Sequence, residues 1–165
     1  MQRITPCLWF DTDGEDAATF YTSVFKNSRI LSISRYGEAG PRPAGSVMTV
    51  SFELDGQQYV ALNGGPDFTF NESISFQVHC ESQEEVDHYW DRLSEGGQAG
   101  PCGRLKDEYG LSWQVIPTAL TELLNDPDPE RAQRAMKAML QMGKIDIDAL
   151  RLAAAQEDGD SVSTS

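Results

Sequence analysis

The chain has 165 residues, of which 13 are basic and 26 acidic, so its formal net charge is −13. Nucleic-acid binding depends on clustered Lys and Arg, so this charge argues against nucleic acid and against an anionic membrane as partners. No stretch approaches the roughly 20 apolar residues that span a bilayer, and the first residues lack the apolar core of a signal peptide. The three cysteines have spacings that fit no zinc site. We therefore expect a cytoplasmic protein with reduced thiols, in which Cys7 and Cys80 are buried.

Residues 4–11 form a short apolar run that predicts a first strand. A polar break follows, where Thr12 and Glu15 have the spacing of a helix capping box. The next apolar residues recur with helical period, which predicts one face of an amphipathic helix. This face consists of Ala17, Phe20, Tyr21, Val24 and Phe25.

The same arrangement recurs 69 residues later. Residues 73–80 have apolar side chains at alternate positions, as in a strand with one buried face. Ser82 and Glu85 then form a second capping box. Subtracting 69 maps the apolar face of the second helix onto that of the first, and it superposes the two preceding strands as well. The second face consists of Val86, Tyr89, Trp90 and Leu93.

Strands are predicted after each helix. After the first helix, residues 30–36, 47–54 and 58–63 have strand composition, and Asp55-Gly56 is a common hairpin turn. After the second helix, residues 111–117 form a clear strand and residues 98–105 a weaker one that contains Gly and Pro. The chain therefore reads βαβββ twice, which predicts an α+β fold.

The pattern becomes helical beyond Pro117. Asp128-Pro129 is a helix start with Asp as the cap and Pro in the first turn. The apolar stripe that follows favours core packing, and a partner-binding groove lined by its methionines is the alternative. Residues 145–155 predict another short helix, and the acidic, Ser/Thr-rich residues 156–165 predict a disordered tail. The stripe consists of Ala132, Ala135, Met136, Met139 and Leu140.

Several segments of the two repeats resemble one known family. They are Leu8-Trp9-Phe10-Asp11, Phe20-Tyr21, Ala61-Leu62-Asn63-Gly64-Gly65-Pro66, Ser75-Phe76-Gln77-Val78 and the run 106–115. Together with the repeat, they resemble the PhnB-like, 3-demethylubiquinone 3-methyltransferase-like group of the vicinal oxygen chelate (glyoxalase-like) superfamily. The resemblance implies one glyoxalase-like domain over residues 1–118, with modules at about 1–66 and 70–118 whose sheets form half-open barrels. A helical extension over residues 119–155 would follow.

Metal-dependent members of that superfamily place two ligands, chiefly His or Glu, on the strands of each module. The resemblance puts these positions at Pro6, at Ala61 or Asn63, at Ser75 and at Gln114. Pro and Ala side chains cannot coordinate, and neutral oxygens are weak ligands for zinc, nickel or iron. We therefore predict no bound metal. No cofactor is predicted either, because the sequence has no G-x-G motif of the kind that cradles nucleotide-like cofactors.

Strand alternation predicts which side chains line a ligand cavity. In the second module, we take Ser75 to point inward, and alternate residues share its face. In the first module, the offset of 69 places Phe10 on the corresponding inward face, so Trp9 points outward against a helix. Trp113 also points outward. The predicted lining mixes aromatic and neutral polar groups, which suits an uncharged or weakly polar organic ligand. It consists of Phe10, Tyr59, Asn63, Ser75, Gln77, His79, Ser112 and Gln114.

Some of these residues have a second interpretation. His79 is more often a structural strand residue than a catalytic one, and Gln114 fits equally well as a strut between strands or as a ligand-orienting amide. Cys102 lies in a loop without an activating base nearby. Arg104 and Lys106 near it could attract an anion, although a solvated loop is the preferred interpretation.

The sequence thus favours a metal-free small-molecule-binding protein without an assigned reaction. One alternative is a metal-dependent lyase, isomerase or dioxygenase of the vicinal oxygen chelate type, and another is an interaction protein that uses the helical tail. A homodimer is expected, because association covers open sheet edges.

Overall fold

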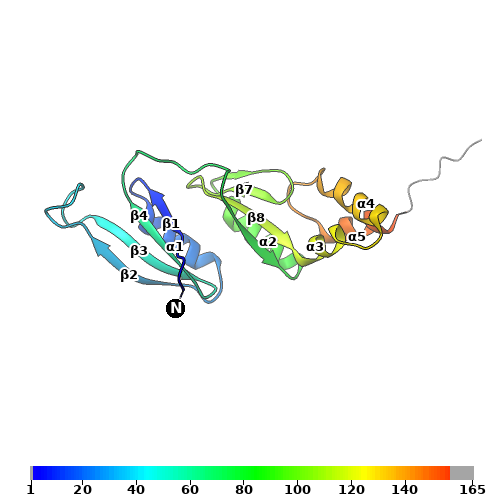
Figure 1. The fold of residues 1–165 in the computed structure, drawn as a ribbon, viewed down its shortest axis with the longest axis horizontal. Helices are drawn as coiled ribbons and strands as arrows, with labels where there is room; N and C mark the ends of the chain where they lie inside the picture. The colour runs from blue at the N-terminus through cyan, green and yellow to red at the C-terminus, as the bar shows by residue number, and fades with distance from the viewer. Residues whose placement is uncertain (1, 157–165) are drawn as a thin grey trace, which may run out of the picture. The chain divides into compact units, whose positions relative to one another are not determined.

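A computed structural model describes residues 2–156. The chain divides into two compact units, Met1–Asn71 and Glu72–Ser165. Each contains one βαβββ module, which confirms the predicted α+β fold, and neither four-stranded sheet is closed (Figure 1). The predicted disordered tail lies, except for Gln156, outside the described residues. None of the described helices has the length and apolarity needed to cross a bilayer.

The first unit is a mixed sheet with one helix. Its strands lie in the order β1-β4-β3-β2, with β1 parallel to β4 and the other pairs antiparallel. The Asp55-Gly56 hairpin is confirmed, since both residues have positive φ, 48° and 85°, as a two-residue turn of this kind requires. The elements are β1 (Cys7–Phe10), α1 (Gly14–Val24), β2 (Arg29–Arg35), β3 (Val47–Leu54) and β4 (Gln57–Asn63).

Helix α1 starts differently from the prediction. Asp13, not Thr12, occupies the N-cap position, and no side chain of the predicted Thr12–Glu15 box caps the helix. The Gly14 N–H instead donates to Asn63 Oδ1 at 2.8 Å, so β4 supplies the cap. A side chain at position 14 would disturb this cap, because a Cβ there would come within 2.7 Å of that same oxygen.

The core of the first unit lies between α1 and one face of the sheet. Ala17, Ala18 and Tyr21 are fully buried on the helix. Tyr21 stacks on Phe52 with ring centroids 6.2 Å apart, and Phe52 stacks on Tyr59 at 5.5 Å. The opposite face of this sheet has no helix of its own unit.

The second unit repeats this plan in the strand order β5-β8-β7-β6. The weak strand predicted over residues 98–105 is in fact two short strands separated by the loop 100–103. The predicted Ser82 cap is confirmed, because its side chain accepts from Glu85 N at 3.2 Å. The elements are β5 (Ser75–Cys80), α2 (Gln83–Ser94), β6 (Gln98–Ala99), β7 (Arg104–Lys106) and β8 (Ser112–Pro117).

Asp107 organises the turn between β7 and β8. Its buried carboxylate accepts from Tyr109 N at 2.9 Å, Leu111 N at 3.0 Å and Trp113 Nε1 at 2.9 Å. Trp113 therefore lies in the buried layer next to α2, as predicted, with its only polar atom satisfied.

Three helices follow β8 and belong to the second unit: α3 (Thr118–Leu124), α4 (Pro129–Met139) and α5 (Ile147–Ala155). Helix α3 lies in the helical extension expected after Pro117, although the sequence did not indicate it as a separate helix. The Asp128-Pro129 start is confirmed, since the Asp128 carboxylate accepts from Glu130 N at 3.0 Å. Met139 packs against a core of Leu120, Ile145 and Leu150, as the core interpretation of the stripe requires. Leu140, by contrast, is 56% exposed.

Cys7 and Cys80 were both expected to be buried, but only Cys80 is. Cys80 is fully buried, and burial together with the nearby Glu85 and Glu81 raises the pKa of its thiol to about 12. Cys7 is exposed, because the β1 residues that face α1 are Leu8 and Phe10, so its predicted burial is wrong.

Candidate ligand-binding site

The open face of the second sheet carries a continuous set of polar side chains. In the parallel pair β5–β8, Ser75 lies beside Ser112, Gln77 beside Gln114, and His79 beside Ile116. The alternate residues of both strands are buried on the α2 side, including Val78, Cys80, Trp113 and Val115. All five residues predicted for the second half of the cavity therefore share one face; their role in ligand binding stays a prediction.

Three of these side chains form a hydrogen-bonded row. Gln77 Nε2 donates to Gln114 Oε1 at 3.4 Å, and Gln114 Nε2 donates to Ser75 Oγ at 2.6 Å. The amide of Gln114 is thus held in one orientation by a partner at each end. Among the described residues, none accepts the Ser75 hydroxyl proton, so Ser75 has a donor that can be aimed at a ligand.

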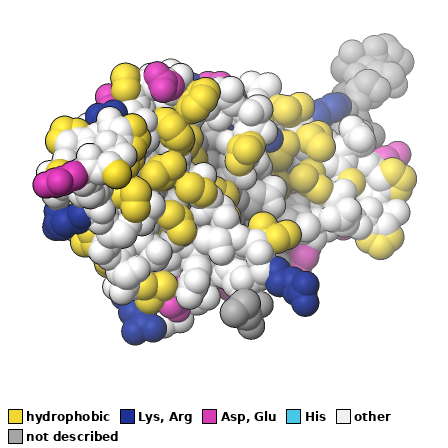
Figure 2. Space-filling model, turned by 60° about the vertical axis from the view of Figure 1, so that its left-hand side comes forward, with side chains coloured by type: hydrophobic (Ala, Val, Ile, Leu, Met, Phe, Trp, Pro, Cys, Tyr) yellow, Lys and Arg dark blue, Asp and Glu magenta, His cyan; other side chains and the backbone are white. Residues whose placement is uncertain are grey.

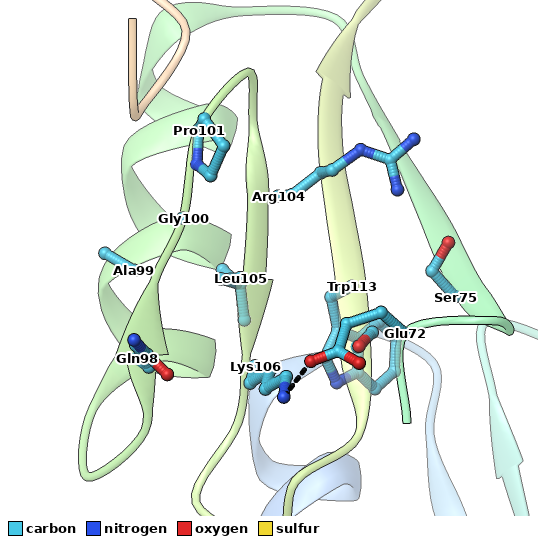
Figure 3. A pocket seen from close by; sticks show the side chains of 11 residues that line it. Glu72, Ser75, Gln98, Ala99, Gly100, Pro101, Arg104, Leu105, Lys106 and Trp113 are labelled. Carbon is cyan, nitrogen blue, oxygen red and sulfur yellow. Dashed lines mark ion pairs between the residues drawn. The ribbon is translucent and has the colours of Figure 1, made fainter. Parts of the chain in front are cut away.

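A hollow of about 310 Å³ lies beside this row. Strand β7 contributes Arg104 opposite Gln114, and Lys106 opposite Ser112, so both cations point to the open face. Figure 3 shows Arg104 extending over β8 toward the strand that carries Ser75, while Lys106 pairs with Glu72. The interpretation of Arg104 and Lys106 as part of a solvated loop is therefore wrong, since both lie on a strand that lines the hollow.

The polar floor of the hollow includes a buried hydroxyl. Ser112 is 6% exposed and its Oγ has no hydrogen-bond partner among the described residues. A buried polar atom without a partner is uncommon in folded proteins and calls for an explanation. The ion pair above it is more exposed, and Lys106 lowers the pKa of the Glu72 carboxyl through a hydrogen bond and charge.

The loop 100–103 forms another wall and is tied to the helical extension. Cys102 N donates to Met142 O and Gly103 N to Gly143 O, both at 2.8 Å. Gly103 has φ 78°, and a Cβ there would lie 2.9 Å from Val115 O, so only glycine fits this approach to β8. The extension therefore braces a loop whose residues Gly100 and Pro101 line the hollow.

The three cavity residues predicted from the first module do not lie on its open face. Phe10 and Asn63 are 4% and 6% exposed, in the layer covered by α1. Tyr59 stacks on Phe52 in that layer, and burial raises the pKa of its phenol. The predicted orientation of all three is therefore wrong. Trp9 lies on the opposite, open face, where its Nε1 donates to Gly65 O at 2.9 Å.

One residue of loop length explains this error. The link from β1 to α1 spans residues 11–13, whereas the link from β5 to α2 spans only residues 81–82. The helices are therefore related by an offset of 69 but the strands by 70, so Phe10 corresponds to Cys80 and Cys7 to Gln77. A shift of one residue moves every side chain of a strand to its other face.

The residues of the open face do not suit a transition metal. The second sheet offers neutral Ser and Gln oxygens and the single imidazole of His79, whereas zinc, nickel or iron prefers several imidazole, thiolate or carboxylate ligands. Within residues 2–156, no three His, Cys, Asp or Glu side chains come together in a way that could hold a metal ion.

Comparisons with known proteins give a family match and, at lower identity, matches of the fold alone. The sequence model of the 3-demethylubiquinone-9 3-methyltransferase family matches residues 2–116. The PhnB protein of Bacillus cereus is 37% identical, with a TM-score of 0.64 over 71% of this chain and 100% of that one. Two further structures share the fold. A Pseudomonas aeruginosa protein is 19% identical, with a TM-score of 0.59 over 71% of this chain and 98% of that one. The fosfomycin resistance protein FosX of Mesorhizobium loti is 15% identical, with a TM-score of 0.54 over 76% of this chain and 100% of that one. No curated protein matches the sequence.

Proposed function

This chain belongs to the 3-demethylubiquinone-9 3-methyltransferase family, and we propose that it is a small-molecule-binding protein that holds its ligand on the open face of the second sheet without a transition metal. The observation that supports this proposal is the hydrogen-bonded row Gln77–Gln114–Ser75, whose Ser75 lines a hollow of about 310 Å³. Ligand pockets combine a concave surface with a few polar groups held in fixed orientations.

The row is suited to recognition. An amide donates and accepts, and the Gln114 side chain already has its donor and acceptor directed along the sheet by Ser75 and Gln77. Because the row orients itself, little side-chain entropy remains to be lost when a ligand binds.

Methyl transfer from a nucleotide-like donor finds little support in the residues. Such donors bind where a Gly-rich turn joins a parallel strand to a helix. Here the corresponding links are Asp11-Thr12-Asp13 and Glu81-Ser82, which are acidic and contain no glycine. An acidic link repels phosphate and carboxylate groups at the position where the backbone would have to receive them.

Native mass spectrometry of protein purified from its host tests the proposal. We expect a bound organic molecule of low mass that leaves on denaturation, and less than stoichiometric metal by elemental analysis of the same sample. Near-stoichiometric zinc, nickel or iron that survives dialysis would favour the metal-dependent lyase, isomerase or dioxygenase instead, and His79 would then be the first ligand to test.

We also propose that the chain acts as a homodimer. The edge strands of the two sheets are β1 and β2 in the first and β5 and β6 in the second, and unpaired sheet edges favour association. Several apolar side chains are also exposed, including Phe68 and Ile74 at 65% each, and Figure 2 shows apolar side chains gathered on the forward face of the first unit. Light scattering behind size exclusion is expected to give twice the chain mass, and a monomer mass across the micromolar range would contradict the proposal.

A further inference from the structure

The charges that line the hollow of the second unit leave one positive charge in excess. Its three charged residues are Glu72, Arg104 and Lys106, and the first and last of these form an ion pair. Arg104 has no ion pair or side-chain hydrogen bond among the described residues. Arg104 is exposed, so its guanidinium is accessible to a ligand and gives this hollow a positive charge in a chain whose formal net charge is −13.

A second hollow provides a contrast. The first unit has one of similar volume, about 320 Å³, lined by Glu15, Asp16 and Arg42 among neutral groups. Arg42 lies 3.8 Å from Asp11, so its charge is compensated. The two hollows therefore differ in sign, and only that of the second unit attracts an anion.

The position of the unpartnered hydroxyl points to the same ligand chemistry. Ser112 lines the hollow between Ser75 on β5 and Lys106 on β7, and its Oγ is buried without a partner. By rotating about χ1, Ser112 can present this hydroxyl to an acceptor in the hollow, and an ionised oxygen is the strongest acceptor. Ser75 supplies a second free O–H on the same side.

The remaining walls indicate that the anion carries an apolar body. Ala99 and Pro101 give the hollow exposed apolar surface, together with Gln98, whereas Leu105 and Trp113 also line it but are only 3% exposed each. A free inorganic ion would leave these surfaces unused. The volume of about 310 Å³ is at the small end of the range for ligand pockets, which fits a compact molecule.

We infer that this hollow binds a small organic monoanion, a carboxylate on an apolar body, whose oxygens meet the guanidinium of Arg104 and the hydroxyls of Ser112 and Ser75. The inference rests on the proposed function and replaces the neutral ligand expected from the sequence. One unpaired cation matches one negative charge, so a carboxylate is preferred over the dianion of a phosphate monoester.

The test is a titration of the full-length protein, followed by backbone amide NMR, with three probes that share a ring: benzoate, benzamide and phenyl phosphate. Benzoate is expected to shift the amides of residues 98–106 and of Ser112, and to bind several-fold more tightly than the other two. Arg104→Gln is expected to weaken benzoate binding by about fivefold or more and to leave benzamide unchanged. Arg151→Gln, an exposed arginine on α5 outside the hollow, is the matched control.

Ser112→Ala separates ligand binding from a structural role. Removing a buried hydroxyl that has no partner should leave the melting temperature unchanged or raise it, while benzoate affinity falls. A lower melting temperature with unchanged affinity would overturn the assignment of Ser112.

The outcomes distinguish this inference from the function on which it rests. If benzamide binds the hollow as well as benzoate and Arg104→Gln changes nothing, the anion is wrong but small-molecule binding stands. Tighter binding of phenyl phosphate, or benzoate shifts confined to the first unit, would also refute the monoanion. If no probe, at tens of millimolar, shifts the amide signals of the open face and native mass spectrometry finds no ligand, both the anion inference and the proposed small-molecule binding fail.

Discussion

Replacing Asn63 by Ala should destabilise the first unit rather than impair ligand binding directly. The side chain accepts from Gly14 N at 2.8 Å and donates to Val47 O at 3.2 Å, so it caps α1 and ties β4 to β3. Each hydrogen bond contributes about 1 kcal/mol, and a buried group left without its partner costs about 1–3 kcal/mol. We therefore expect a loss of roughly 2–3 kcal/mol, which corresponds to about 30- to 150-fold in an equilibrium constant.

Hydrogen exchange at single amides measures this effect where it arises. Gly14 N–H should lose protection first, and the amides of β3 and β4 should follow with the loss of unit stability. Asn125→Ala is the matched control, because that exposed side chain bonds only Thr121 O, at 2.8 Å within its own turn. The control should change protection by well under 1 kcal/mol.

The alternative is that Asn63 faces the ligand cavity, as strand alternation predicted from the sequence. If Asn63→Ala leaves the exchange of Gly14 and the melting temperature unchanged but weakens binding of the native ligand, then Asn63 lines the cavity and the structural role is refuted. Asn63→Asp adds a second check: its carboxylate can still accept from Gly14, but it cannot donate to Val47 O and would be a buried charge. It should therefore also destabilise the unit.

Three further predictions concern Gln114, the two strand cysteines and Gln83. Gln114→Leu should cost less than about 1 kcal/mol of stability, because its two hydrogen bonds lie on a half-exposed face, but weaken native ligand binding a few-fold; a clear fall in melting temperature with unchanged affinity would identify a strut. Iodoacetamide at pH 8 should modify Cys7 well before Cys80, as peptide mass spectrometry can show. The pKa of Cys80 in the folded protein, about 12, lies above the ordinary 9.0, so the thiol ionises first in the unfolded protein. The stability that the neutral thiol contributes is therefore complete below pH 9 and is lost as pH rises toward 12. Rapid labelling of Cys80 in the folded protein would contradict its burial. Gln83→Ala removes bonds to Ile145 O and Ile147 N, at 3.0 and 2.8 Å, so exchange in α5 should accelerate about tenfold, whereas equal acceleration in β1 to β4 would argue against a local clamp.

Elements with a strong local signal could be predicted from the sequence. Strand β3 has the predicted bounds 47–54, because a two-residue turn follows it and its buried residues alternate. Helix α4 begins at Pro129 as its Asp-Pro start indicates. Helix α3 could not be found in the same way, since it has only seven residues and its N-cap residue, Pro117, makes no side-chain cap.

The functional residues were harder to predict, because they depend on partners distant in sequence. Arg104 and Lys106 follow a loop with two glycines and a proline, so locally they resemble loop residues. Pairing with Gln114 and Ser112 of β8 makes them strand residues and sets the face to which they point. The composition of the predicted cavity alone indicated a neutral ligand. The strand register showed that Arg104 also lies on the face that carries the polar row.

The first sheet shows why alternation alone is not sufficient. Both faces of β1 carry apolar side chains, so hydrophobicity cannot decide whether Leu8 and Phe10 or Trp9 lies against α1. The cap on Gly14 decides it: Asn63 must face α1 to reach that amide, and β1 is paired with β4 so that Phe10 lies beside Asn63.

With the strands of the two units matched at an offset of 70, the side chains suited to ligand recognition lie in the second unit. The strand pairings place Val60 where the second unit has Gln114, Cys7 where it has Gln77, and Trp9 where it has His79. At each position an apolar or weakly polar side chain in the first unit corresponds to an amide or imidazole in the second. Because desolvated amides and guanidinium groups discriminate among ligands more strongly than apolar surface does, substitutions that change ligand specificity should concentrate in β5, β7 and β8.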